Sequence, residues 1–165
     1  MKKALAYIGF PLFALGTGFL SSFLSQDGIE SMQPILDQIP LNPPNIVFPI
    51  VWSLLYILMG ISAARIFLKQ NSFRSTAAVL WITQLAVNFG WSILFFRMQL
   101  YFVSFLWLIL LWLLVGAFIL AARPICKAAA YLQIPYLLWL TFAGFLNFSA
   151  WQISQTETIK AAFLV

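Results

Sequence analysis

The chain has 165 residues, of which 63% are hydrophobic and only 8% are charged. Soluble domains carry roughly a quarter charged residues, so this composition argues against an ordinary globular protein and indicates a membrane protein. The net charge of +5 comes from nine basic residues that stand singly or in pairs, a pattern typical of membrane topology signals and not of a nucleic-acid-binding patch.

Five apolar segments are long enough to cross a membrane, because about 20 helical residues span a hydrocarbon core of roughly 30 Å. We predict an all-α membrane protein in which residues 1–165 form a single five-transmembrane-helix bundle. The expected spans are residues 4–24, 46–69, 75–96, 101–122 and 128–153, followed by a short tail from Ser154 to Val165. The first span follows two lysines, as a secretory signal would, but its apolar run exceeds the roughly 7–15 residues of a signal core.

Residues 25–45 form the expected first loop, and their composition differs from that of the spans. The loop contains three acidic residues, four prolines and no basic residue. Long loops often serve as lids or binding elements, but a plain solvated connection is an equally good interpretation.

The basic residues are distributed unevenly between the two ends of the expected helices. Seven of the nine fall on the side of the N-terminus, namely Lys2, Lys3, Arg65, Lys69, Arg74, Arg123 and Lys127. Arg97, Lys160 and all four acidic residues fall on the other side. The positive-inside rule therefore predicts a multi-pass cell-membrane protein with a cytoplasmic N-terminus, and with the first loop and the C-terminus outside. An even number of spans would destroy this partition.

The middle of every expected span lacks ionisable side chains. Proton-coupled transporters and ion pumps need such a group inside the membrane to hold the coupled charge. Proton coupling is therefore disfavoured, whereas facilitated passage of an apolar molecule is not. The absence of histidine and the single cysteine, Cys126, likewise argue against a zinc or iron site and an internal disulfide.

Uncharged polar and aromatic residues recur at helical spacing in three spans. The three sets are Trp52, Tyr56, Met59 and Ala63; Gln84, Asn88 and Trp91; and Tyr136, Trp139, Ala143 and Asn147. Each set occupies one helix face, and amide side chains in hydrocarbon must face protein. These faces either form hydrogen bonds that hold the bundle together, the interpretation favoured for Gln84, or line a pocket for a flat apolar ligand. Spacing alone does not decide between them.

The remaining tryptophans are expected to anchor helices at the membrane interface, and we assign Trp81, Trp107, Trp112 and Trp151 no role in a site. Small residues four apart, Gly60 with Ala64 and Ala117 with Ala121, favour close helix contacts within the bundle or in a homodimer.

Three segments resemble signatures of the tryptophan-rich sensory protein/translocator protein (TspO/MBR) family. They read PPNIVFPIVWSLLYILMG from Pro43, NFGWSILFF from Asn88 and IPYLLWLTFAGFLN from Ile134. The resemblance implies a five-helix bundle, usually dimeric, that binds porphyrins without a covalent bond and, in some members, sterols and synthetic benzodiazepine-site ligands. It also implies a ligand pocket beneath the first loop, formed by Pro43, Trp52, Tyr56, Asn88, Trp91, Trp139, Ala143, Leu146 and Asn147.

The resemblance leaves three activities to consider. The first is a membrane receptor or sensor for tetrapyrroles, and the second is a transporter of porphyrin or another apolar metabolite. The third is light-dependent porphyrin degradation, for which the resemblance points to Trp52 and Trp139. The chain departs from the family pattern in the first loop, where Met32 and Gln33 replace an aromatic pair and Leu41 replaces a tryptophan. It also lacks the tyrosine and basic residue of a sterol-recognition stretch at the end of the fifth span.

Overall fold

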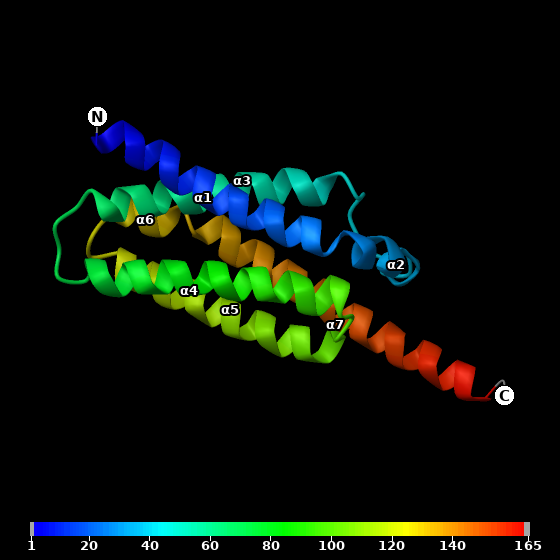
Figure 1. Ribbon diagram of the computed structural model, residues 1–165. Coiled ribbons are helices and arrows are strands. Elements are labelled where there is room, and N and C mark those ends of the chain that lie inside the picture. Colours follow the sequence, from blue (N-terminus) through cyan, green and yellow to red (C-terminus); the bar gives the residue numbers. More distant parts are fainter. Residues whose placement is uncertain (1, 164–165) are drawn as a thin grey trace.

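The computed structural model describes residues 2–163, except for the side chains at positions 158 and 160–163. This described part of the chain is a bundle of helices without strands (Figure 1). The elements are α1 (Lys2–Leu24), α2 (Gln26–Leu36), α3 (Val47–Phe67), α4 (Arg74–Ser92), the π-helix η1 (Ile93–Arg97), α5 (Tyr101–Ala122), α6 (Lys127–Tyr131) and α7 (Ile134–Phe163).

Within the described residues, five helical stretches are long and apolar enough to cross a membrane. They are Lys2–Leu24, Val47–Phe67, Arg74–Arg97, Tyr101–Ala122 and Lys127–Glu157. The predicted five-helix membrane architecture is therefore confirmed, with boundaries that differ from the expected ones by a few residues.

The first loop is not a loop throughout, because residues 26–36 form α2. One face of this helix carries Gly28, Met32 and Leu36, which are all buried. Residues four apart share a helix face, so burying this face against the bundle stabilises a short helix that propensity alone would not support. Pro34 lies in its last turn, and the proline-rich part of the segment follows the helix.

Two further differences concern the third and fifth spans. The third ends in a π-helix from Ile93 to Arg97, after which Gln99 adopts a positive φ of 51°. The fifth is interrupted between Tyr131 and Ile134, and α7 then continues to Phe163. Most of the expected tail from Ser154 is therefore helical.

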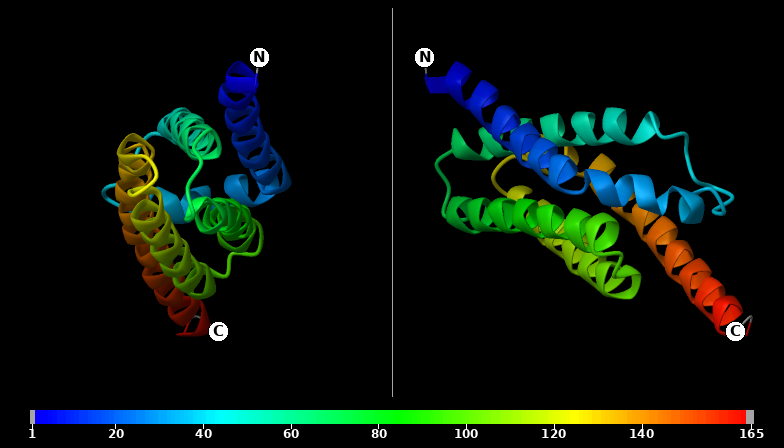
Figure 2. Two further views of the ribbon diagram at one scale, coloured as in Figure 1. Left: turned by 90° about the vertical axis from the view of Figure 1, so that its left-hand side faces the viewer. Right: turned by 45° about the vertical axis from the view of Figure 1, so that its right-hand side comes forward.

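The closest helix pairs are α1 with α3, α4 with α5, and α5 with α7. Gly60 permits the first of these contacts, because a Cβ atom there would collide with the backbone of Pro11. By contrast, the backbones of α4 and α7 make little contact, and side chains bridge the space between them. The end-on view in Figure 2 shows α1, α3, α4, α5 and α7 arranged around this interior.

The connections lie at two ends of the bundle, as the charge partition requires. The start of α1, the α3–α4 connection and the α5–α6 connection share one end, while α2 and the α4–α5 connection lie at the other (Figure 1). We call these the N-terminal end and the α2 end. The seven basic residues that the sequence assigns to one side are at the N-terminal end. Which end faces the cytoplasm stays a prediction.

The expectation for Trp81 was wrong. Its side chain is 4% exposed, and its indole N–H donates to the carbonyl of Met59 at 3.1 Å. Trp107 likewise donates to the carbonyl of Val87 at 2.8 Å. Both indoles therefore connect neighbouring helices, because a donor facing the bundle interior needs an acceptor there.

Candidate functional site

The candidate site begins on α3, where Trp52 and Tyr56 share a face as predicted. Their ring centroids lie 5.6 Å apart with an interplanar angle of 31°. Tyr56 is buried at 7% exposure, and Trp52 is partly buried in the bundle interior. The two rings form a continuous aromatic surface on the inner face of α3.

A hydrogen-bonded layer joins this face of α3 to α4 and α7. The Tyr56 hydroxyl donates to Oδ1 of Asn88 at 2.6 Å, and Nδ2 of Asn88 donates to the Tyr136 hydroxyl at 2.8 Å. Tyr136 and Asn88 are 0% and 2% exposed. We call these three residues the tyrosine–asparagine layer. This arrangement gives the Asn88 amide both an acceptor and a donor role.

A second polar cluster lies nearer the α2 end and is centred on Asn147 of α7. Its Nδ2 atom donates to the carbonyl of Tyr101 at 3.0 Å and to the hydroxyl of Ser104 at 3.1 Å. Its Oδ1 atom accepts from the indole of Trp91 at 3.4 Å. The bundle-holding interpretation of Asn88 and Asn147 is therefore satisfied in this structure, and both amides sit at fixed positions in the interior.

Aromatic rings fill the space between these two polar features. The Trp52 ring lies 6.1 Å from Trp91 on α4 and 6.1 Å from Tyr136 on α7, in addition to its contact with Tyr56. Offset or edge-to-face contacts at such distances are the favourable geometry for aromatic pairs. The structure therefore brings together three of the predicted residues, Trp52 and Tyr56 from α3 and Trp91 from α4.

Trp139 lies beside this group and contacts other partners. Its ring centroid is 6.0 Å from that of Phe48 and 5.5 Å from that of Phe142. Its indole nitrogen is buried and has no hydrogen-bond partner. An unpaired buried donor is costly, so Trp139 presents a polar group that an acceptor could satisfy.

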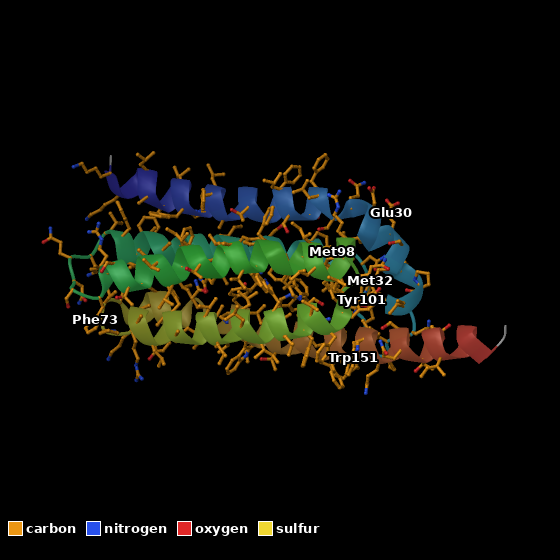
Figure 3. The ribbon with its side chains drawn as sticks, turned by 60° about the horizontal axis from the view of Figure 1, so that its bottom comes forward. Glu30, Met32, Phe73, Met98, Tyr101 and Trp151 are labelled. Carbon is orange, nitrogen blue, oxygen red and sulfur yellow. The ribbon has the colours of Figure 1, made fainter. Side chains whose placement is uncertain are left out.

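The α2 helix covers the site at its α2 end. Met32 is 0% exposed and belongs to one packed cluster with Trp91, Phe95, Ala143 and Leu146. Figure 3 shows Met32 and Tyr101 at this end of the bundle, with Phe73 at the opposite end. The cover is therefore an aliphatic helix face that shares one packed cluster with three predicted site residues, and not an aromatic loop. Pro43 lies in the segment between α2 and α3 and is partly buried.

Two grooves lie elsewhere on the described part of the molecule. One of about 440 Å³ runs between α5 and α7, and one of about 240 Å³ lies at the junction of α1 and α2. None of the nine predicted binding residues lines either groove. Within the predicted site the ring of Trp52 lies 5.6 to 6.1 Å from its aromatic neighbours, so a flat ligand would have to separate these rings.

Sequence reasoning missed several members of the site. The sequence predicts that Tyr136 shares a helix face with Trp139 but does not assign it to the pocket, although this spacing is a usable signal. Tyr101 and Ser104 gave no signal, because α5, which is the fourth membrane span, is almost uniformly apolar. Phe48 contacts Trp139 from the first turn of α3, which spacing could not reveal.

Comparison with known proteins identifies the family. The TspO/MBR family profile matches residues 9–152. The chain belongs to this family. It is 34% identical over 143 residues to the tryptophan-rich protein TspO of Chlorobaculum tepidum, and the alignment covers 85% of this chain and 90% of that protein. It is 33% identical over 152 residues to the translocator protein of Ovis aries, and the alignment covers 90% of this chain and 89% of that protein. It is 39% identical over 117 residues to the protein CrtK of Rhodobacter capsulatus, and the alignment covers 70% of this chain and 73% of that protein.

The TspO/MBR match and the five apolar helices together make this chain a multi-pass membrane protein in a lipid environment. All nine residues implied by the resemblance, from Pro43 to Asn147, lie inside the matched segment. The last part of α7, after residue 152, lies outside it.

Proposed function

We propose that this member of the TspO/MBR family is an integral membrane receptor or sensor that binds tetrapyrroles, in particular porphyrins, between its helices beneath α2. The supporting observation is the position of Trp52, whose ring lies 5.6 to 6.1 Å from the rings of Tyr56, Trp91 and Tyr136. A flat macrocycle can replace such ring–ring contacts with stacking of similar kind. Entry of the ligand would therefore lose little of the aromatic packing energy.

The proposed roles follow from the chemistry of each side chain. Trp52, Tyr56, Trp91 and Trp139 would stack against the macrocycle. The Asn88 and Asn147 amides, together with the unpaired Trp139 indole N–H, would orient its polar groups. The remaining apolar contacts would come from Ala143, Leu146 and Pro43. Small residues such as Ala143 leave room for a ligand between helices.

The membrane orientation and assembly complete the proposal. The positive-inside bias supports a cytoplasmic N-terminal end, with α2 and the C-terminus outside. The family resemblance supports a homodimer and binding of synthetic benzodiazepine-site ligands in the same pocket.

The test is tryptophan fluorescence of the purified protein during addition of protoporphyrin. We expect saturable quenching, and a higher half-saturation concentration for the variant that combines Trp139→Phe with Asn147→Leu. Loss of two contacts of about 1 kcal/mol each corresponds to roughly a 30-fold change. Trp112→Phe is the matched control, because Trp112 lines the outer α5–α7 groove. Unchanged half-saturation in the double variant would refute the proposed site.

Transport of porphyrin or another apolar metabolite is the second candidate. It is supported by the absence of ionisable residues from the middle of the spans, which suits facilitated passage and not proton-coupled pumping. Liposomes containing the protein should then accumulate the ligand down its gradient. Binding without net flux would reject transport and leave the receptor proposal intact.

Light-dependent porphyrin degradation is the third candidate, because Trp52 contacts a series of aromatic rings and Trp139 has an unpaired indole N–H. Illumination should bleach the porphyrin absorbance faster with the protein than without it. Equal rates would remove this activity. A protein-dependent rate that survives replacement of both Trp52 and Trp139 by phenylalanine would remove their assigned role.

A further inference from the structure

Two glutamines that the candidate site does not use are completely buried. Gln84 on α4 and Gln133 between α6 and α7 are both 0% exposed. The nitrogen and the oxygen of each carboxamide have no hydrogen-bond partner in the protein, so the bundle-holding interpretation of Gln84 was wrong. Buried carboxamides are almost always hydrogen-bonded, because an unpaired amide in an apolar interior keeps its full desolvation cost. Four such atoms on two side chains therefore point to a polar ligand.

The helical register places both carboxamides at one level of the bundle. Asn88 donates to the Tyr136 hydroxyl across the interior. Gln84 precedes Asn88 by four residues, and Gln133 precedes Tyr136 by three, with the Leu137 N–H donating to the Gln133 carbonyl as in a helix. Because α4 and α7 both run toward the α2 end (Figure 1), each glutamine lies about one turn nearer the N-terminal end on the corresponding face.

The surroundings of this level suit a polar site inside the bundle. The backbones of α4 and α7 make little contact, so side chains must fill the space between them. Gln133 also lies at the break between α6 and α7. Interrupted helices inside membranes are tolerated where the break is buried in protein or lines a polar site.

We propose that Gln84 and Gln133 form a second binding site, separate from the aromatic pocket, and that its ligand is water. Each carboxamide offers donors and an acceptor, which matches the two donors and two acceptors of a water molecule. Buried waters bridge two to four polar groups in this way. A charged ligand does not fit, because the middle of the spans holds no ionisable side chain to neutralise it.

The tyrosine–asparagine layer separates this hydrated site from the aromatic pocket. Asn88 bonds to both Tyr56 and Tyr136 one turn nearer the α2 end. They form the floor of the pocket and the roof of the hydrated site. The proposal rests on the two glutamines and is independent of whether a tetrapyrrole binds above the layer.

The test is nuclear magnetic resonance of the full chain with labelled glutamine and tryptophan side chains, in detergent whose alkyl chains are protonated. We expect cross-peaks between water and the carboxamide protons of both Gln84 and Gln133. Gln84→Leu and Gln133→Leu each remove one set of signals and assign them, and Met can replace Leu where a variant does not fold. The Trp81 indole N–H is the dry control, because it is buried and bonded to the Met59 carbonyl, so it should show no such peak.

Two other results would contradict the proposal. Cross-peaks between the two carboxamides without any contact to water would mean that they pair directly, and would overturn the proposal. Contacts to detergent protons alone would also overturn it, because the site would then open to the apolar phase.

Discussion

Replacing Asn88 by leucine removes the centre of the tyrosine–asparagine layer and leaves two buried hydroxyls unpaired. In the intact protein the Asn88 amide accepts from Tyr56 at 2.6 Å and donates to Tyr136 at 2.8 Å. Leucine has nearly the same size, so the substitution changes polarity more than packing. Both tyrosines then keep a buried hydroxyl, at 7% and 0% side-chain exposure, without this partner.

The expected cost follows from these two hydroxyls. A buried polar group that loses its partner costs about 1–3 kcal/mol, so the two hydroxyls predict a loss of about 2–6 kcal/mol in the free energy of unfolding. Hydrogen bonds between membrane helices average about 0.6 kcal/mol in measured cycles, so a loss of about 1 kcal/mol is the lower bound. Removing all three polar groups, with Tyr56→Phe, Asn88→Leu and Tyr136→Phe together, should restore most of the stability, because no unpaired group then remains.

The assay is equilibrium unfolding in mixed micelles with increasing sodium dodecyl sulfate, followed by circular dichroism. Thr17→Val is the matched control, because the Thr17 hydroxyl donates to the Phe13 carbonyl within its own helix and should change stability by less than about 0.5 kcal/mol. An Asn88→Leu variant that loses no more stability than Thr17→Val would contradict the predicted role of the layer. A triple variant that is less stable than Asn88→Leu alone would also contradict it, since packing and not polarity would then dominate.

Two glycine substitutions test the helix packing. Gly60→Ala should destabilise the bundle by about 1–3 kcal/mol, because its Cβ would collide with the backbone of Pro11. Gly116→Ala is the control with open space around it and should be neutral or gain up to about 1 kcal/mol; equal effects in the same unfolding assay would contradict the α1–α3 contact. Gly28→Ala should displace α2, because its Cβ would collide with the Phe96 carbonyl. Limited proteolysis within residues 25–45 should then be faster than in the unsubstituted protein, and an unchanged rate would exclude tight docking of α2.

Much of the site could be predicted because polar side chains inside a membrane must face protein and not lipid. Asn88 and Asn147 had to face protein, and the helical repeat then placed Trp91 and Ala143 on the same inner faces. Trp52 and Tyr56 followed from the same repeat on α3. These residues are brought together in the structure because each face is the least lipid-compatible surface of its helix.

The partners of those residues could not be predicted. Nothing in the spacing indicates that Asn88 bonds to Tyr136, or that Asn147 bonds to Ser104. Trp81 illustrates the same difficulty, because an aromatic belt and a buried indole look alike in sequence. Its burial depends on the carbonyl of Met59, an acceptor on another helix that only the packing brings within reach.

Composition and hydropathy alone determined that this chain spans a membrane five times, because a hydrocarbon core requires about 20 apolar residues per helix whatever their order. The sequence also determined the uneven distribution of charge between the two ends of the bundle, because this depends only on where each charged residue stands relative to the apolar segments. Only the tertiary structure decided that residues 26–36 form a helix, that Met32 is buried in one cluster with Trp91, Ala143 and Leu146, and that Gln84 and Gln133 are buried without a protein partner. Each of these depends on a surface supplied by another helix, and a single sequence does not specify which surfaces meet.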